Sequence, residues 1–305
     1  MLQRVLHRLW MIVLVLVCSV SPAVAAPKRL LVVSVTTGYR HASISSLKKM
    51  LAQFSQSTGE FTLDYVDQPP GKPADLKKDA TPADKAAHAA AEHDWEENAL
   101  KPAMQKLAPA QLRGYDGVVF ASTTGELPLP DPQGFLDWIA AGHAFIGLHA
   151  ASDTLHHWAP YAKMLGGEFD HHGKQVGVNL INADPQNPAD AALPKTWTIA
   201  QEEIYQFKKG YDPATVHELL YLDKNPETGA PGHYPISWCK AYGKGRVFYT
   251  ALGHRDDLID PDPSLKNRVN SVEISKVYDA HVLGGIEWAL GIKPGSSAPG
   301  RLSPQ

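Results

Sequence analysis

The chain has 305 residues, 44% of them hydrophobic and 20% charged, with a formal net charge of −3 at pH 7. This composition excludes an intrinsically disordered chain, and the lack of a basic stripe argues against nucleic acid as a partner. The length suits one large α/β domain or two smaller domains.

The first 25 residues are predicted to be a secretory signal peptide. Arg4 and Arg8 precede an apolar run over residues 9–17, and a small-residue stretch ends at Ala25. A positive start, an apolar middle and an A-x-A site mark such peptides. The alternative is an uncleaved membrane anchor, for which the apolar run is short. We expect cleavage after Ala25, a periplasmic or secreted location, and no membrane contact afterwards.

Cleavage would leave one cysteine in the mature chain. Of the two cysteines, Cys18 and Cys239, only Cys239 follows the cleavage site. No internal disulfide can then form, and any metal would be held by histidines and carboxylates. Loss of two arginines also changes the formal charge from −3 to −5.

Strands and helices alternate between residues 30 and 165, which predicts a parallel sheet with helices on both faces. Continuous apolar runs are typical of buried parallel strands, and apolar residues at helical spacing mark the helices between them. The predicted strands are residues 30–35, 61–66, 115–121 and 144–148, and the predicted helices are 43–57, 94–107 and one capped by Asp131.

Residues 67–93 interrupt this alternation. They begin with a Pro- and Gly-rich cluster and continue as Ala-, Lys- and Asp-rich sequence. We interpret them as a solvent-facing, partly helical insertion.

The second half of the chain is richer in strands. Its predicted elements are strands at 176–181, 219–222, 236–239 and 246–252 and a closing helix at 278–290. A Pro-, Ser- and Gly-containing tail over residues 293–305 is expected to be disordered.

Three predicted strands are followed by a histidine: His41, His149 and His254. Because carboxyl ends of parallel strands meet at one edge of a sheet, we expect these side chains to converge. Histidines and carboxylates serve both acid–base catalysis and divalent-metal binding. The spacing matches no compact metal motif, so a Zn, Mn or Fe site and a metal-free site both stay open.

Several segments together resemble the ThuA-like (trehalose utilisation) family. The longest are GLHAASDT at 147–154, GRVFYTALGH at 245–254 and LGGIEWALG at 283–291. Shorter matching segments lie at 37–41, 157–158, 165–169, 193–197 and 203–207. The resemblance covers about residues 29–292 as a single domain, and its motifs are specific only in combination.

This resemblance implies an α/β fold similar to class I glutamine amidotransferases, a flavodoxin-like three-layer sandwich with a mainly parallel central sheet. In that superfamily a nucleophilic cysteine occupies a sharp strand-to-helix turn, and a histidine follows a later strand. Here His149 takes the cysteine position and His254 that of the later histidine. Glutaminase chemistry requires a thiolate, and Cys239 lies in a different predicted strand, so we expect no glutaminase activity.

The resemblance also points to carbohydrate metabolism, with a hydrolase- or lyase-type enzyme acting on trehalose-like disaccharides or 3-keto glycosides. The alternative is a non-catalytic carbohydrate-binding or complex-forming protein, and a homo-oligomer stays open. The expected catalytic residues are His149, His254, His41, Glu203 and Asp153, and the three histidines are also candidate metal ligands. The residues expected to contact substrate are Tyr39, Arg40, His157, Trp158, Asp170 and Tyr205.

Overall fold

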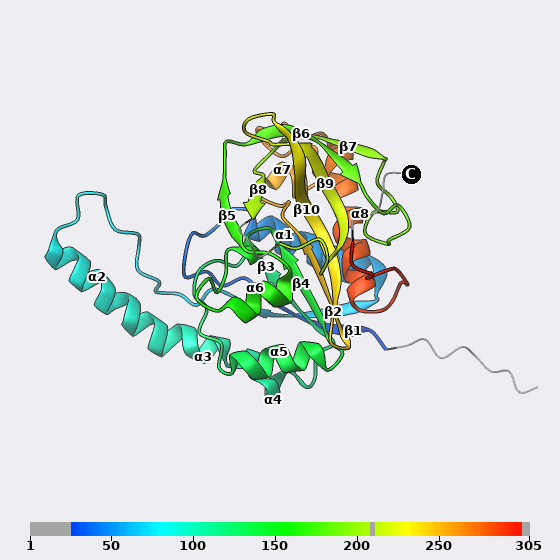
Figure 1. The fold of residues 1–305 in the computed structure, drawn as a ribbon. Helices are drawn as coiled ribbons and strands as arrows, with labels where there is room; N and C mark the ends of the chain where they lie inside the picture. Colours follow the sequence, from blue (N-terminus) through cyan, green and yellow to red (C-terminus); the bar gives the residue numbers. More distant parts are fainter. Residues whose placement is uncertain (1–25, 208–210, 301–305) are drawn as a thin grey trace, which may run out of the picture.

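The computed structural model describes residues 26–207 and 211–300 (Figure 1). The predicted signal peptide, residues 1–25, lies outside the described residues. Within the described ranges, no helix has both the length and the apolar character that a membrane crossing would need.

A mixed sheet of nine strands runs through the described part of the chain, in the order β2-β1-β3-β4-β11-β10-β9-β6-β7. The parallel half consists of β2 (Phe61–Val66), β1 (Lys28–Val33), β3 (Gly117–Ala121), β4 (Ala144–Leu148) and β11 (Gly245–Thr250). The antiparallel half consists of β10 (Pro231–Tyr242), β9 (His217–Lys224), β6 (Val176–Asn182) and β7 (Thr196–Glu202). The order of the parallel half is that of flavodoxin-like folds.

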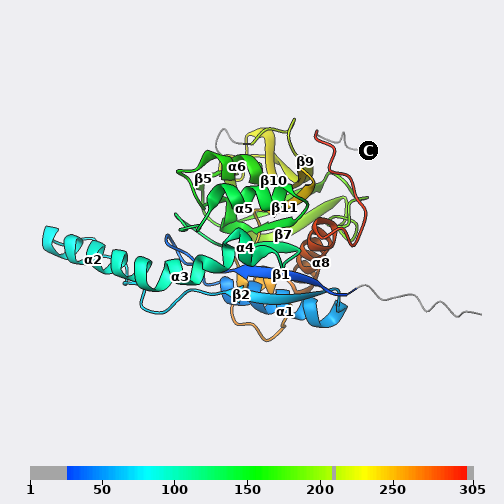
Figure 2. The ribbon, with the colours of Figure 1, turned by 90° about the horizontal axis from the view of Figure 1, so that it is seen from below.

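Helices cover both faces of the parallel half. One layer contains α1 (Ile44–Thr58), α7 (Asp256–Ile259) and α8 (Val272–Ala289). The other contains α4 (Pro109–Leu112), α5 (Pro132–Ala140) and α6 (Ala159–Leu165). Within the first layer α1 contacts α7 and α7 contacts α8, while α5 and α6 both contact β11. Figure 2 shows α1 and the α5–α6 layer on opposite sides of the sheet. The predicted three-layer sandwich is thereby confirmed.

The core lies between these layers. Every residue of β3 and β4 is buried, because helices exclude water from both faces of the strands. Helix α8 approaches β11 closely at Gly285, where an added Cβ would lie 2.4 Å from the Phe248 ring. Any larger residue at position 285 would push α8 away from the sheet.

The predicted helix start at Asp131 is present, since its carboxylate accepts the Gly134 N–H at 2.8 Å. The insertion and the helix predicted after it form one almost continuous helical segment. It consists of α2 (Pro82–Trp95), a π-helical turn (Glu96–Leu100), α3 (Lys101–Met104) and a 3₁₀ turn (Gln105–Leu107). Helix α2 projects away from the sheet (Figure 1), and among its residues only Trp95 is buried.

The tail differs from its prediction. Over residues 293–300 it is bonded to the body of the protein. The carbonyl of Ala298 accepts a hydrogen bond from His217 Nδ1 at 2.8 Å, and the N–H of Gly300 donates to the Val216 carbonyl at 2.9 Å. These bonds tie the segment to the start of β9, which corrects the expectation of disorder for this part of the tail.

Candidate functional site

His149 stands directly after β4 in a left-handed backbone conformation, with φ of 48°. A 3₁₀ turn, η3 (His149–Ser152), begins at this residue. A left-handed conformation costs a non-glycine residue about 1–2 kcal/mol, and such residues cluster at functional sites. The backbone therefore turns sharply where β4 ends, as the sequence predicts for residues 147–153.

The His149 ring is held in one tautomer. It is fully buried, and its Nδ1–H donates to the Ala251 carbonyl at 2.8 Å. Burial, reinforced by His41, holds the pKa of His149 well below its usual range. The neutral ring therefore presents the lone pair of Nε2, which has no hydrogen-bond partner among the described residues. This nitrogen lies 3.8 Å from Oε2 of Glu203.

His41 and His254 reach the same place from the loops that follow β1 and β11. The His41 ring centroid is 4.7 Å from that of His149 and 5.3 Å from that of His254. Burial and nearby His254 lower the pKa of His41 to about 4. His254 behaves differently: burial opposes its charge, but Glu203, 3.1 Å from Nδ1, raises its pKa. The expected convergence of the three strand-end histidines is thus present.

Glu203 follows β7 and adds a carboxylate to the three imidazoles. Its Oε2 faces His149 and His254, and its Oε1 lies 3.2 Å from Nδ1 of His172. One ligand atom from each of His41, His149, Glu203 and His254 can be chosen so that all lie within 4.8 Å of one another. Three imidazoles and one carboxylate at this spacing could hold a divalent metal ion.

A cavity of about 400 Å³ opens onto this set. Its walls carry the aromatic rings of Tyr39, Phe169 and Tyr205 and the polar side chains of Asp153 and His172. The volume lies within the range of small-molecule sites, which combine apolar walls with a few polar groups.

Most of the predicted site residues therefore meet at one place. They are His41, His149, His254, Glu203, Asp153, Tyr39 and Tyr205. Tyr205 belongs to a separate two-stranded sheet of β5 (Phe169–His172) and β8 (Tyr205–Phe207). Its ring centroid lies 4.5 Å from that of His149. The Tyr205 ring therefore packs against the buried His149 ring and also lines the cavity.

Four residues predicted to contact substrate lie outside the lining of this cavity: Arg40, His157, Trp158 and Asp170. The Arg40 guanidinium donates to the Ser34 carbonyl at 2.8 Å, directly after β1. The His157 side chain is 87% exposed and pairs with Glu126. Trp158 packs against the hydrophobic core, and Asp170 pairs with exposed His171. The structure corrects their placement, because each side chain is engaged elsewhere.

His172 and Phe169 also line the cavity, although the sequence pattern does not single them out. Strict alternation would place residues three apart on opposite faces of a strand. The pairing of β5 with β8 is irregular between Phe169 and His171, which changes the phase of the alternation. The cluster of polar residues at 170–172 was the only sign in the sequence of a site near β5. The irregular pairing of β5 with β8 determines which of these residues faces the cavity.

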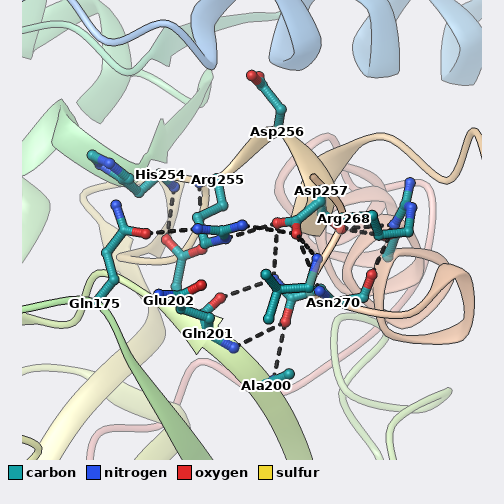
Figure 3. Close-up of polar contacts among 12 residues, drawn as sticks. Gln175, Ala200, Gln201, Glu202, His254, Arg255, Asp256, Asp257, Arg268 and Asn270 are labelled. Atoms are coloured by element: carbon teal, nitrogen blue, oxygen red, sulfur yellow. Dashed lines mark hydrogen bonds and ion pairs between the residues drawn. The ribbon is translucent and has the colours of Figure 1, made fainter. Parts of the chain in front are cut away.

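Buried carboxylates fix the turn that carries His254 (Figure 3). Glu202 is fully buried, and its Oε1 accepts the backbone N–H of His254 at 2.8 Å. Burial raises the pKa of Glu202 to about 7, against the effect of this bond. Next to it, the Arg255 guanidinium makes two parallel bonds to Asp257, at 2.8 and 2.9 Å. The backbone of His254 is therefore held in place by the buried carboxylate of Glu202.

Asn270 connects this network to β7. Its Nδ2 donates to the Gln201 carbonyl at 2.8 Å and to Asp257 Oδ1 at 3.0 Å, and its Oδ1 accepts the Ala200 N–H at 3.0 Å. Because Asp257 belongs to α7, these bonds hold the edge strand β7 against the short helix that follows the central strand β11 (Figure 3). They explain how Glu203, which follows the edge strand, reaches histidines at the centre of the sheet.

A second histidine set has the residue types of a hydrolase triad. His281 lies 3.1 Å from both Asp190 Oδ1 and Ser237 Oγ. All three side chains are completely buried, and the Ser237 hydroxyl donates to the Tyr249 carbonyl at 2.7 Å. A serine nucleophile gives its proton to the histidine, whereas here that proton is bound to a carbonyl. We interpret this set as a core hydrogen-bond network.

Comparison with known proteins places this geometry in a family. The family model described as "ThuA: Trehalose utilisation" matches residues 29–289. A putative thua-like protein from Parabacteroides merdae ATCC 43184 is 18% identical, with a TM-score of 0.59 over 92% of this chain and 98% of that one. One from Bacteroides uniformis ATCC 8492 is also 18% identical, with a TM-score of 0.55 over 88% and 95%. No curated protein matches the sequence. Because the family model covers most of the chain, the protein belongs to the ThuA (trehalose utilisation) family.

Proposed function

We propose that this protein is a metal-dependent enzyme of carbohydrate metabolism that acts on trehalose-like or 3-keto disaccharides and glycosides. The observation that carries the proposal is the buried, unpartnered Nε2 of His149 beside His41, His254 and Glu203. Family membership supports a sugar as the substrate class. The cavity of about 400 Å³ above this set supports a small-molecule substrate.

The donor set fits a divalent metal ion. Nδ1 of His41 and Nε2 of His149 are buried and lack hydrogen-bond partners among the described residues. Both rings are neutral at pH 7, because burial lowers the pKa of each. A metal-binding histidine commonly donates its other N–H to a carbonyl, as His149 does to Ala251. We infer that His41, His149, Glu203 and His254 hold Zn, Mn or Fe, which would polarise a hydroxyl or carbonyl oxygen of the sugar.

The walls supply the remaining functions. The rings of Tyr39, Phe169 and Tyr205 offer apolar faces against which a sugar ring can pack. Asp153 and His172 are the acid–base groups on the wall, within reach of a ligand in the cavity. Such a site suits hydrolase or lyase chemistry on a glycoside.

Glutaminase activity is not part of this proposal. The turn after β4 carries an imidazole in place of a thiol. Cys239 is buried in β10, where burial raises the pKa of its thiol well above the usual range. A reactive cysteine needs a readily formed thiolate, so Cys239 is unsuited to the role.

Metal analysis tests the proposal. Mature protein produced in medium supplemented with Zn, Mn and Fe should contain about one ion per chain by mass spectrometry. Chelator treatment should remove both the ion and the conversion of trehalose or 3-keto-trehalose, and the matching metal should restore them. The His157→Gln variant should retain the ion, because His157 lies outside the set.

Two results would contradict this view. If the protein takes up none of the three metals, the proposed metal site is wrong and any catalysis must rely on acid–base groups only. Tight sugar binding without product, with every metal tried, would favour a non-catalytic carbohydrate-binding protein. We also propose export, which predicts that the protein in the periplasmic or secreted fraction begins at Ala26.

Glu202 offers a test of how the metal set is positioned. The Glu202→Ala variant should bind Zn²⁺ about 10- to 100-fold more weakly, because the His254 backbone loses its buried acceptor. Glu202→Gln keeps an acceptor oxygen and should lose less. A competition titration with a chelator measures both affinities. Wild-type affinity in a folded Glu202→Ala protein would show that the turn needs no such support.

A further inference from the structure

Asp153, on the cavity wall, is the last member of a chain of three polar side chains. Nε2 of His156 lies 2.7 Å from Oδ1 of Asp153, and Nδ1 of His156 lies 2.9 Å from Oε1 of Glu168. The three side chains are only 19–27% exposed. The chain therefore runs from a partly buried carboxylate to the cavity.

The geometry determines the charge of His156. Ionised carboxylate oxygens only accept hydrogen bonds, so a ring with a carboxylate at each nitrogen carries a proton on both. His156 is thus an imidazolium between two carboxylates. Asp153 and Glu168 are the charged groups that face it, and they raise the pKa of His156 against the opposing effect of burial.

The backbone around Asp153 is fixed as well. The Asp153 carbonyl accepts the N–H of Gly125 at 2.8 Å, and the Gly125 carbonyl accepts the N–H of Leu155 at 3.0 Å. Leu155 is itself left-handed, with φ of 58°. This pair of bonds ties the segment between η3 and α6 to the loop after β3, so Asp153 is rigidly placed four residues after His149.

We propose that Asp153 is the general base of the cavity and that His156 and Glu168 are positioning residues for its carboxylate. The proposal rests on the proposed function and deepens it. Asp153 takes a proton from the carbon next to the keto group of a 3-keto sugar. The electrons of that C–H bond form a carbon–carbon double bond, the glycosidic C–O bond breaks, and Asp153 returns the proton to the departing oxygen. The His156 imidazolium holds Oδ1 of Asp153 in place, and Glu168 holds the imidazolium from its other nitrogen.

The polypeptide offers a matched control one residue away from His156. His157 also pairs with a carboxylate, Glu126, at 3.0 Å. Its side chain is 87% exposed and does not line the cavity. Replacing His157 therefore measures the effect of losing a histidine–carboxylate pair away from the cavity. Replacing His156 measures the additional effect of losing the contact with Asp153.

The first measurement does not depend on turnover. In an NMR titration of the ring nitrogens of metal-loaded protein, His156 should stay doubly protonated above the usual histidine pKa of about 6.5. The Glu168→Gln variant should lower the His156 midpoint by about one pH unit or more. A neutral His156 at pH 7 in the wild type would overturn the imidazolium bridge.

The second measurement uses 3-keto-trehalose as the probe. The His156→Gln variant should lose about 100-fold in kcat with a nearly unchanged KM. Loss of the positive charge beside Asp153 should move the acidic limb of the kcat/KM profile to higher pH. His157→Gln should match the wild type in both respects.

The possible results distinguish the positioning role of His156 from the proposed function. Wild-type turnover and pH profile in His156→Gln would overturn the positioning role and leave the proposed function intact. No turnover of the probe by metal-loaded wild type would overturn the proposed function and the role of Asp153 with it.

Discussion

Replacing His149 with asparagine should abolish metal retention and turnover while the protein still folds. Asparagine adopts left-handed backbone conformations more readily than most residues, so the turn at φ of 48° can persist. The substitution removes the Nε2 that faces Glu203. Because loss of an outer-sphere partner already costs metal sites 10- to 100-fold, loss of this ligand should weaken Zn²⁺ binding by more than about 100-fold.

Metal content and thermal unfolding, measured on the same preparation, check this result. His157→Asn is the matched control and should retain both metal and stability, since His157 is 87% exposed. A His149→Ala variant should behave like His149→Asn in metal content but unfold at a lower temperature, because alanine tolerates a left-handed φ less well. A folded His149→Asn protein with wild-type Zn²⁺ affinity would remove His149 from the site.

Replacing Asp257 with alanine should give the largest loss of stability, about 3–5 kcal/mol in the free energy of unfolding. Asp257 is 3% exposed and pairs with Arg255, whose side chain is 19% exposed. It also accepts hydrogen bonds from the N–H groups of Val269 and Asn270. Its removal leaves a partly buried guanidinium, the buried Asn270 N–H and the partly buried Val269 N–H without their acceptor. Urea unfolding measures the change, and exposed Asp223→Ala should stay within about 0.5 kcal/mol of wild type.

The same carboxylate predicts a dependence on pH. Burial would raise the pKa of Asp257, but the bonds from Arg255 and from the Val269 and Asn270 N–H groups bring it to about 2. An unfolded aspartate titrates near about 3.9. The stabilisation is therefore complete above the unfolded value and disappears as the pH falls toward 2. The stability gap between wild type and Asp257→Asn should shrink between pH 5 and pH 2, and a constant gap would contradict the assignment.

The parallel half of the fold was predictable because its strands are continuous apolar runs separated by amphipathic helices. Two of the missed strands, β5 and β8, lack any such signal. β5 and β8 have four and three residues, too few for a periodic pattern. β7 was also missed, although Trp197 and Ile199 alternate with polar neighbours along it. The alternation in β7 could be recognised from the sequence, but the position of β7 at the edge of the sheet could not.

The candidate site was predictable to the extent that topology controls it. The strand-end histidines converge because parallel strands end at one edge. Glu203 arrives through the Asn270 network, which joins β7 to the loop after β11, and no local pattern reports such a connection. His157 and Asp170 were misplaced because proximity in sequence does not reveal which side chain turns toward a cavity.

The position of β11 at the centre of the sheet has a consequence for biosynthesis. β4 pairs with β3 on one side and with β11 on the other, although about a hundred residues separate Ile146 from its partner Phe248. Until residues 245–250 are available, β4 has an unpaired edge, and such edges promote association between chains. An amino-terminal fragment can therefore complete neither the sheet nor the four-residue set that ends at His254. Partly made copies should therefore accumulate as aggregates rather than as folded protein with a weakened site.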